Sequence, residues 1–292
     1  MSRTKSNSYE TREIKSWREF DDFSPGSKQC VYRGQGSFEW DLSTGYERTK
    51  HVLNPMCEQD MLVRFMSQAG MYTSILPGRN DFVSWFSLMQ HYGAGTRLLD
   101  VSRSKYIALF FAINGMIEKQ KESCAVWAIN TYASNLQFYN TVLKSDSTGC
   151  IDTRDIPLAV ALEEYKTLGW RFANKFIVSD WEQEISNVNV DDYVEKYKDK
   201  MGVFLESGGI MEVVPQIQNA RMIAQAAEFL MPITLRKTFM NNLSDGNCSP
   251  EIVKLEIKRE NCGAFLEKLN DMNVTWRTVY PDISGLAKDM NW

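Results

Sequence analysis

Hydrophobic positions along this chain recur at two spacings, one typical of helices and one typical of strands. Helical spacing occurs in SWREFDDF, in residues 56–72 and 80–91, from Tyr106 to Ile117 and in residues 262–272. Short apolar runs or alternation predict strands in CVYRG, TRLLDV, CAVWAINTY, GGIMEVVPQ, AAEFLMPITL and IVKLEIKREN. Because the two kinds of element are mixed rather than strictly alternating, the pattern predicts an α+β fold with helices flanking the sheet.

The same pattern divides the chain into three parts. Residues 1–13 are polar and predict a flexible leader, and the ordered domain is expected to begin at Ile14 and run to residue 292. Residues 133–200 combine helical character with the charged segment DDYVEKYKDK, so we expect a helical insertion there. We therefore predict a single domain with an embedded insertion.

Composition narrows the class of protein. With 292 residues, of which 43% are hydrophobic, the chain can bury a sizeable core. A net charge of −4 argues against broad, unspecific affinity for nucleic acid. The sequence has no apolar signal core and no run approaching 18 apolar residues, so we expect no membrane partner.

The cysteines and histidines are too scattered for a structural zinc site. The six cysteines form no CxxC pair and only two histidines accompany them, whereas such a site needs four clustered ligands. We interpret the cysteines as reduced thiols and expect a cytoplasmic protein without a metal.

Arg33 is the first candidate binding residue. It ends a predicted strand and precedes Gly34, which permits close backbone approach, and a guanidinium suits bidentate capture of phosphate or carboxylate. The structural alternative is an ion pair with one of the 37 acidic residues.

The segment QHYGAGTRLLDVSRSKYIALFFAI, residues 90–113, holds the densest set of candidates, namely His91, Thr96, Arg97, Asp100 and Ser102. Asp100 and Ser102 are two apart on a predicted strand, so their side chains share one face. The structural alternatives are a helix cap supplied by Ser102 or Ser104, and an ion pair of Asp100 with Arg97 or Arg103.

Two further features carry possible chemistry. Glu228 lies in the apolar run AAEFLMPITL, where it is either a solvent-facing strand residue or a site carboxylate held despite its desolvation cost. A nucleophilic pair of Cys30 with His91 is compatible with the sequence, but no third, orienting group is identifiable.

Several blocks together resemble the FRG domain, a bacterial family named for a Phe/Tyr-Arg-Gly signature. They are SWREF, VYRGQ, WDLSTGYER, QHYGAGTRLLDVSRSKYIALFFA, NARMIAQAAEFL and VYPDISGLAKD, spanning about residues 14–290. Ala227 departs from the family, which usually has glycine at that position.

A second resemblance, to arginine-type ADP-ribosyltransferases, concerns three short motifs in order: VYRG with Arg33, LLDVSRSKYIALFFA with Asp100 and Ser102, and AAEFLMP with Glu228. It implies a core of split or mixed β-sheets. Ala226 replaces the first glutamate of the Glu-x-Glu motif, which makes arginine doubtful as the acceptor.

This second resemblance implies an NAD-dependent ADP-ribosyl transfer or NAD cleavage, in a bacterial toxin or defence effector. Glu228 would stabilise the oxocarbenium-like state, with Asp100 or His91 activating the acceptor. Arg33, Gly34, Ser102, Thr96 and Arg97 would bind NAD. The acceptor, protein or nucleic acid, stays open.

Two other functions compete with this one. A binding module would use the same residues to recognise a nucleotide or a nucleic-acid end without turnover, as a sensor. A hydrolase of a phosphorylated or nucleotide substrate is the other alternative, which the lack of metal-ligand clusters disfavours.

Overall fold

The computed structural model describes residues 9–25, 30–49, 54–132, 135, 172–178, 181, 206, 208–245 and 251–290. Their strands are β1 (Glu10–Glu13), β2 (Cys30–Gln35), β3 (Leu99–Ser102), β4 (Ser123–Asn130), β5 (Ile210–Val213), β6 (Ala227–Pro232) and β7 (Glu251–Lys258). Their helices are α1 (Trp17–Asp22), α2 (Gly45–Thr49), α3 (Pro55–Ala69), α4 (Phe82–His91), α5 (Lys105–Glu118), α10 (Ala220–Ala224), α11 (Phe239–Asp245), the 3₁₀ turn η2 (Arg259–Asn261), α12 (Cys262–Asp271), α13 (Trp276–Val279) and α14 (Ile283–Asp289).

The strands form one mixed seven-stranded sheet in the order β1-β7-β4-β2-β3-β6-β5. β1 pairs with β7 in parallel, and the other neighbours are antiparallel. The α+β class predicted from the sequence is confirmed. Of the expected split or mixed sheets, the mixed arrangement is confirmed, and the sheet is continuous rather than split. However, β2 and β3 pair only at Tyr32 and Ser102. Its two halves therefore diverge from a single point of contact.

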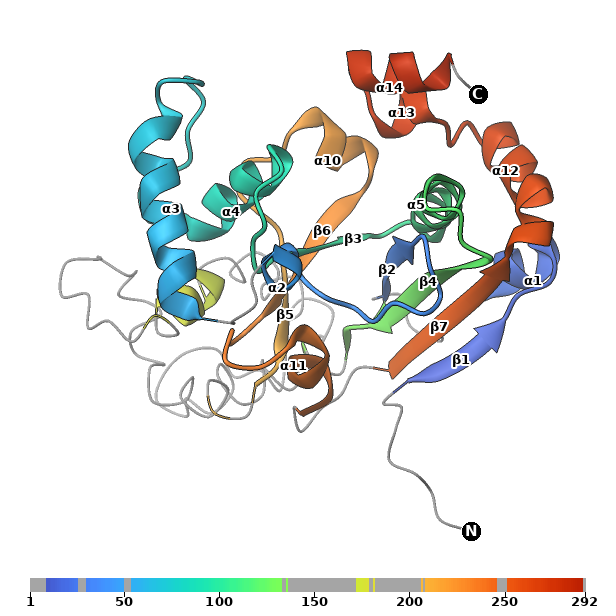
Figure 1. The fold of residues 1–292 in the computed structure, drawn as a ribbon, viewed down its shortest axis with the longest axis horizontal. Coiled ribbons are helices and arrows are strands. Elements are labelled where there is room, and N and C mark those ends of the chain that lie inside the picture. The colour runs from blue at the N-terminus through green and yellow to red at the C-terminus, as the bar shows by residue number, and fades with distance from the viewer. Residues whose placement is uncertain are drawn as a thin grey trace, which may run out of the picture.

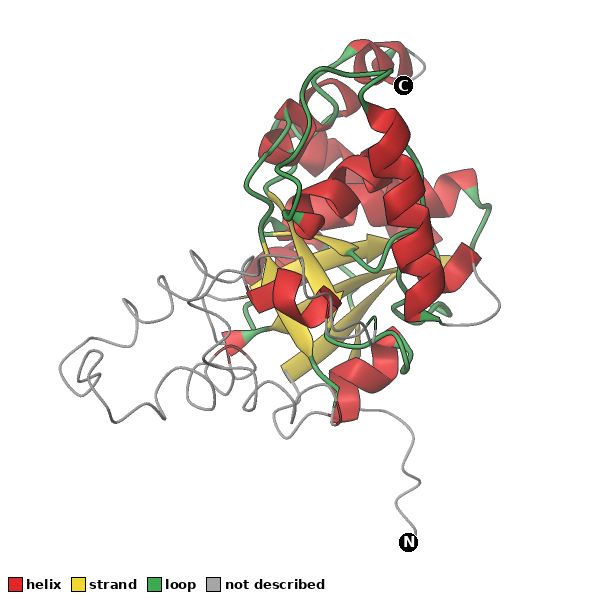
Figure 2. Cartoon of the chain, turned by 90° about the vertical axis from the view of Figure 1, so that its left-hand side faces the viewer, coloured by secondary structure: helices red, strands yellow, loops and turns green. Residues whose placement is uncertain are grey.

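Most helices cover one face of this sheet (Figures 1 and 2). α5 packs on β2 and β4, with α1 and α12 beside it, over the half of the sheet that contains β1, β7, β4 and β2. α3 and α4, together with the helical residues 172–178, cover the half that contains β3, β6 and β5. A third apolar cluster, which includes Phe239 and Leu243 of α11, fills the opposite face. The helical layer is thus divided where the two sheet halves meet.

Local sequence explains the turn from β3 into α5. Ser104 is the N-cap of α5, and its Oγ accepts a hydrogen bond from the Ile107 amide at 3.4 Å. The expectation that Ser102 or Ser104 caps this helix is therefore confirmed. Ser102 Oγ accepts from the Ser104 amide at 3.0 Å and donates to the Gln225 carbonyl at 2.7 Å, which ties the turn to the segment before β6.

Two expectations about chain organisation meet the structure only in part. The flexible leader over residues 1–13 is wrong for Glu10–Glu13, which form β1 because their backbone pairs with the exposed edge of β7. Their side chains are all exposed, so no apolar pattern marks the strand. The insertion over residues 133–200 lies almost wholly outside the described residues. None of the described helices combines the length and apolarity that a membrane span requires.

Candidate functional site

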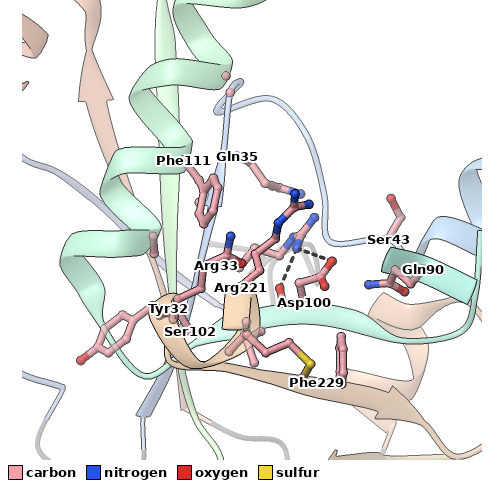
Figure 3. A pocket seen from close by; sticks show the side chains of 18 of the residues that line it. Tyr32, Arg33, Gln35, Ser43, Gln90, Asp100, Ser102, Phe111, Arg221 and Phe229 are labelled. Atoms are coloured by element: carbon pink, nitrogen blue, oxygen red, sulfur yellow. Dashed lines mark hydrogen bonds and ion pairs between the residues drawn. The ribbon is translucent and has the colours of Figure 1, made fainter. Parts of the chain in front are cut away.

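A cavity of about 900 Å³ opens beside the point where β2 and β3 diverge (Figure 3). Residues of β2, β3, α4 and α5 line it together with residues of α10, β6 and the loop after α13. This volume is within the range of about 300–1,000 Å³ that is typical of small-molecule and cofactor sites. The lining combines charged groups with aromatic side chains such as Phe111 and Tyr280.

Arg33 reaches from β2 across the gap between the sheet halves. Its Nη1 donates to the Asp100 carbonyl at 2.6 Å and lies 3.7 Å from Asp100 Oδ2. Its Nε is buried without a hydrogen-bond partner. Burial lowers the pKa of Arg33, while Asp100 raises it and Arg48 lowers it further. The guanidinium still carries its charge, so the cavity wall presents a desolvated cation with an unused donor.

Asp100 and Ser102 both line the cavity from β3, as their two-residue spacing predicted. The Asp100 side chain is 58% exposed, and its carboxylate pairs with Arg33. The alternative partners Arg97 and Arg103 are wrong, whereas the ion pair suggested for Arg33 is confirmed. Ser102 is a structural residue of the wall, since its hydroxyl is engaged by the two backbone groups described above.

The opposite wall carries a second cation, Arg221 of α10. Its Nη2 binds Asp282 Oδ2 at 2.8 Å and its guanidinium lies 4.6 Å from the centre of the Tyr280 ring. Its Nε is buried without a hydrogen-bond partner, like that of Arg33. Figure 3 shows the Arg33 and Arg221 side chains both extending into the cavity. Unsatisfied buried donors cost about 1–3 kcal/mol each, so two of them in one cavity favour an acceptor-rich ligand.

His91, the last residue of α4, also lines the cavity. Its Nδ1 lies 3.4 Å from Nδ2 of the Asn219 side chain. Burial lowers the pKa of His91, and the nearby charge of Arg221 lowers it further, while Asp282 raises it. The imidazole is therefore neutral at pH 7 and is suited to accept a proton or to hydrogen-bond a ligand.

Thr96 and Arg97 were expected to bind a ligand, and the structure places them elsewhere. Both are fully buried and neither lines the cavity. Arg97 Nε donates to both carboxylate oxygens of Glu58, at 2.9 and 2.8 Å. Thr96 Oγ1 bonds to the Gln90 side chain and accepts from the Leu98 amide. These residues fix α3 and α4 against the start of β3, so the expected binding role is wrong because the core uses their polar groups.

Gly34 borders the cavity, but its missing side chain serves helix packing. A Cβ on Gly34 would lie 1.8 Å from the Ala108 carbonyl oxygen of α5. A Cβ on Gly36 would likewise clash with the backbone of Gly115 in the same helix. The two glycines let α5 contact β2 backbone to backbone, which brings the cavity residues on both elements together.

Glu228 lies on the other face of the sheet. Its neighbours Ala227 and Phe229 line the cavity, and Glu228, between them on β6, is absent from the lining. Its Oε1 accepts from Arg103 Nε at 2.8 Å, and Arg103 also binds Glu212 of β5. The expectation that Glu228 shares one cleft with Arg33 and Ser102 is therefore wrong.

The strand register explains this placement. Glu228 pairs with Val101, whereas Asp100 and Ser102 pair with the cavity residues Phe229 and Ala227. Because side chains alternate along a strand, Glu228 takes the face of Val101. Burial and the adjacent Glu212 carboxylate raise the pKa of Glu228 to about 7, with Arg103 opposing them.

The Cys30–His91 pair is not assembled. Cys30 is buried and does not line the cavity, whereas His91 does. Burial, aided by the carboxylates of Glu251 and Glu212, raises the pKa of the Cys30 thiol to about 12, against the opposing effect of Arg103. A protonated buried thiol is a poor nucleophile. Within the described part of the chain, no three His, Cys, Asp or Glu side chains are grouped so that they could hold a metal ion.

No pattern in the sequence predicts the second wall of the cavity. Arg221, Asn219 and Tyr280 belong to the blocks NARMIAQAAEFL and VYPDISGLAKD, which carry the family resemblance, but nothing in their spacing connects them to Arg33. The usable signal was a single arginine in a block that is mostly apolar.

Comparison with known protein families gives a match over part of the chain. Residues 28–121 match the FRG domain family, and this segment contains β2, β3, α4 and α5 with Arg33, His91 and Asp100. No curated protein matches the chain, and no solved structure matches it either. The segment that builds the Arg33 wall of the cavity is therefore similar to the FRG domain family.

Proposed function

We propose that the cavity binds a nucleotide, NAD or a related one, with its phosphates on the arginine-lined walls. The observation that carries this proposal is the buried, unpartnered Nε of Arg33 at the wall of a 900 Å³ cavity. A phosphate oxygen accepting from Nε would satisfy that donor and neutralise a desolvated charge.

The second wall supports the same class of ligand. Arg221 offers another buried donor without a partner, and Arg48 of α2 adds a third cation to the lining. Phe111 and Tyr280 provide aromatic surface, and their ring centres are 6.0 Å apart. Phosphates beside guanidinium groups and a base or ribose against aromatic rings are the contacts that a nucleotide requires.

Calorimetric titration tests this binding function. NAD, ATP and ADP-ribose are titrated into the protein, its Arg33→Gln variant and the control Arg18→Gln, which removes the same charge from an exposed site on α1. Losing one charge-assisted contact costs about 1.5–3 kcal/mol, so we expect Arg33→Gln to weaken binding at least tenfold and Arg18→Gln to leave it unchanged. Absence of binding to the unaltered protein contradicts the proposal.

NAD cleavage is a second candidate, favoured by one observation. The Asp100 carboxylate lines the cavity and is half-exposed, so a carboxylate is available there to stabilise an oxocarbenium-like state although Glu228 is not. In this candidate reaction the acidic residue is Asp100 rather than Glu228.

Release of nicotinamide from labelled NAD, with and without protein, DNA and RNA acceptors, tests this reaction. We expect Asp100→Asn to abolish release and Glu228→Gln to retain it. Loss in Glu228→Gln with Asp100→Asn still active would contradict the assignment. Binding without release in the unaltered protein would favour the non-catalytic sensor instead.

A further inference from the structure

Arg221 belongs to the cavity and to the contact between α10 and the last two helices. It lines the cavity, while its Nη2 holds Asp282 Oδ2 at 2.8 Å and its guanidinium stacks on Tyr280 at 4.6 Å. Asp282 is in turn the N-cap of α14, because its Oδ1 accepts from the Ser284 amide at 2.8 Å. One guanidinium thus joins the cavity wall to the start of α14.

The helix pair α13–α14 forms part of that wall. Gln225 donates through Nε2 to the Val279 carbonyl at 3.2 Å, and Phe111 of α5 packs edge-on against Tyr280. In Figure 1 the pair lies above the sheet next to α10 and α5. Any displacement of α13–α14 therefore shifts both Tyr280 and the partner of Arg221.

Arg221 can hold an anion without releasing Asp282. Nη2 faces Asp282, whereas Nε is buried and has no hydrogen-bond partner. A guanidinium presents its five donors in a planar fork, so a second acceptor can bind the donors that Asp282 leaves free. Asp282 and an anionic ligand would together hold the Arg221 guanidinium in place, and the guanidinium would in turn order both anions.

We propose that Asp282 is a positioning residue that fixes Arg221 for ligand binding and couples occupancy of the cavity to the docking of α13–α14. This inference rests on the proposed function, because it requires an anionic ligand in that cavity. Ligand binding would slow local opening of α14, and loss of the Asp282 charge would weaken ligand binding in return, because such coupling is reciprocal.

The test uses the variant Asp282→Asn and the matched control Asp289→Asn. Asparagine is as good an N-cap as aspartate, so the first variant keeps the start of α14 and loses only the charge opposite Arg221. The second removes the carboxylate that pairs with Arg277 at 3.2 Å within the same two helices, without touching Arg221. Affinity for pyrophosphate and for NAD, and amide exchange in residues 283–289, are measured for each protein.

We expect a three- to tenfold loss of affinity in Asp282→Asn and none in Asp289→Asn. We also expect ligand to slow exchange in residues 283–289 of the unaltered protein and of Asp289→Asn, but not of Asp282→Asn. Equal affinity and equal protection in Asp282→Asn and the unaltered protein would overturn the coupling while leaving the proposed function intact. If pyrophosphate binds and slows amide exchange in residues 283–289, and NAD binds no more tightly than pyrophosphate, the nucleotide proposal falls and the coupling stands. If neither probe binds, both fall.

Discussion

Replacing Glu228 by glutamine removes a carboxyl group whose ionisation opposes folding at neutral pH. Burial raises the pKa of Glu228 to about 7 from its ordinary 4.5. The unfolded chain loses this proton near pH 4.5 and the folded protein keeps it until about pH 7, so stability falls as pH rises between these values. The full penalty, reached above pH 7, is about 3 kcal/mol. We therefore expect Glu228→Gln to gain about 2–3 kcal/mol on the unaltered protein between pH 5 and pH 8.

Urea unfolding followed by tryptophan fluorescence measures this gain, since the chain has eight tryptophans. Curves are recorded from pH 5 to pH 8 for the unaltered protein, for Glu228→Gln and for the control Glu118→Gln. The control removes an exposed carboxylate from a surface pair with Lys119, whose contribution is small. A stability difference between Glu228→Gln and the unaltered protein that is the same at every pH would contradict the raised pKa of Glu228. It would show that Glu228 does not share a buried charge cluster with Glu212 and Arg103.

Two further predictions concern the scaffold that holds the cavity. Gly34→Ala places a methyl group 1.8 Å from the Ala108 carbonyl oxygen and should destabilise the protein by at least about 3 kcal/mol in thermal unfolding. The control Gly263→Ala, with no atom within 4 Å of the added methyl group, should be neutral or stabilising. Equal melting temperatures of the two variants would contradict the close packing of α5 on β2. Glu58→Gln removes the carboxylate that pairs with the buried Arg97 guanidinium and should cost about 3–5 kcal/mol, and adding Arg97→Met should restore part of that stability. Additive losses in urea unfolding would show that the two residues do not act as a pair.

Periodicity predicted most elements because their burial follows it. The stripe from Tyr106 to Ile117 became α5, and the alternation in CAVWAINTY became β4, since each buries a regular set of apolar positions. β1 was not predicted, because its exposed residues are held by backbone pairing to β7 and show no apolar pattern. Short helices such as α10 and α11 were not predicted either, because five to seven residues contain too few repeats to establish a period.

The candidate site was predictable only in its local part. The spacing of Asp100 and Ser102 placed both on one face of β3, and the strand end before Gly34 singled out Arg33. The pairing of β2 with β3 at Tyr32 and Ser102 then brings Arg33 beside Asp100. The face of Glu228 could not be inferred, because it depends on the register between β3 and β6, and a shift of one residue would reverse it. Arg221 and Tyr280 meet Arg33 through tertiary packing of distant segments, which short motifs do not encode.

A crystal structure of the protein grown with saturating NAD would show whether the cavity holds the dinucleotide. We expect the dinucleotide in the cavity between α5 and α10, with a phosphate oxygen within hydrogen-bond distance of Arg33 Nε. We expect Glu228 to lie remote from the ligand on the other face of the sheet. An empty cavity in the presence of saturating NAD, or a dinucleotide bound beside Glu228 and Glu212, would contradict it.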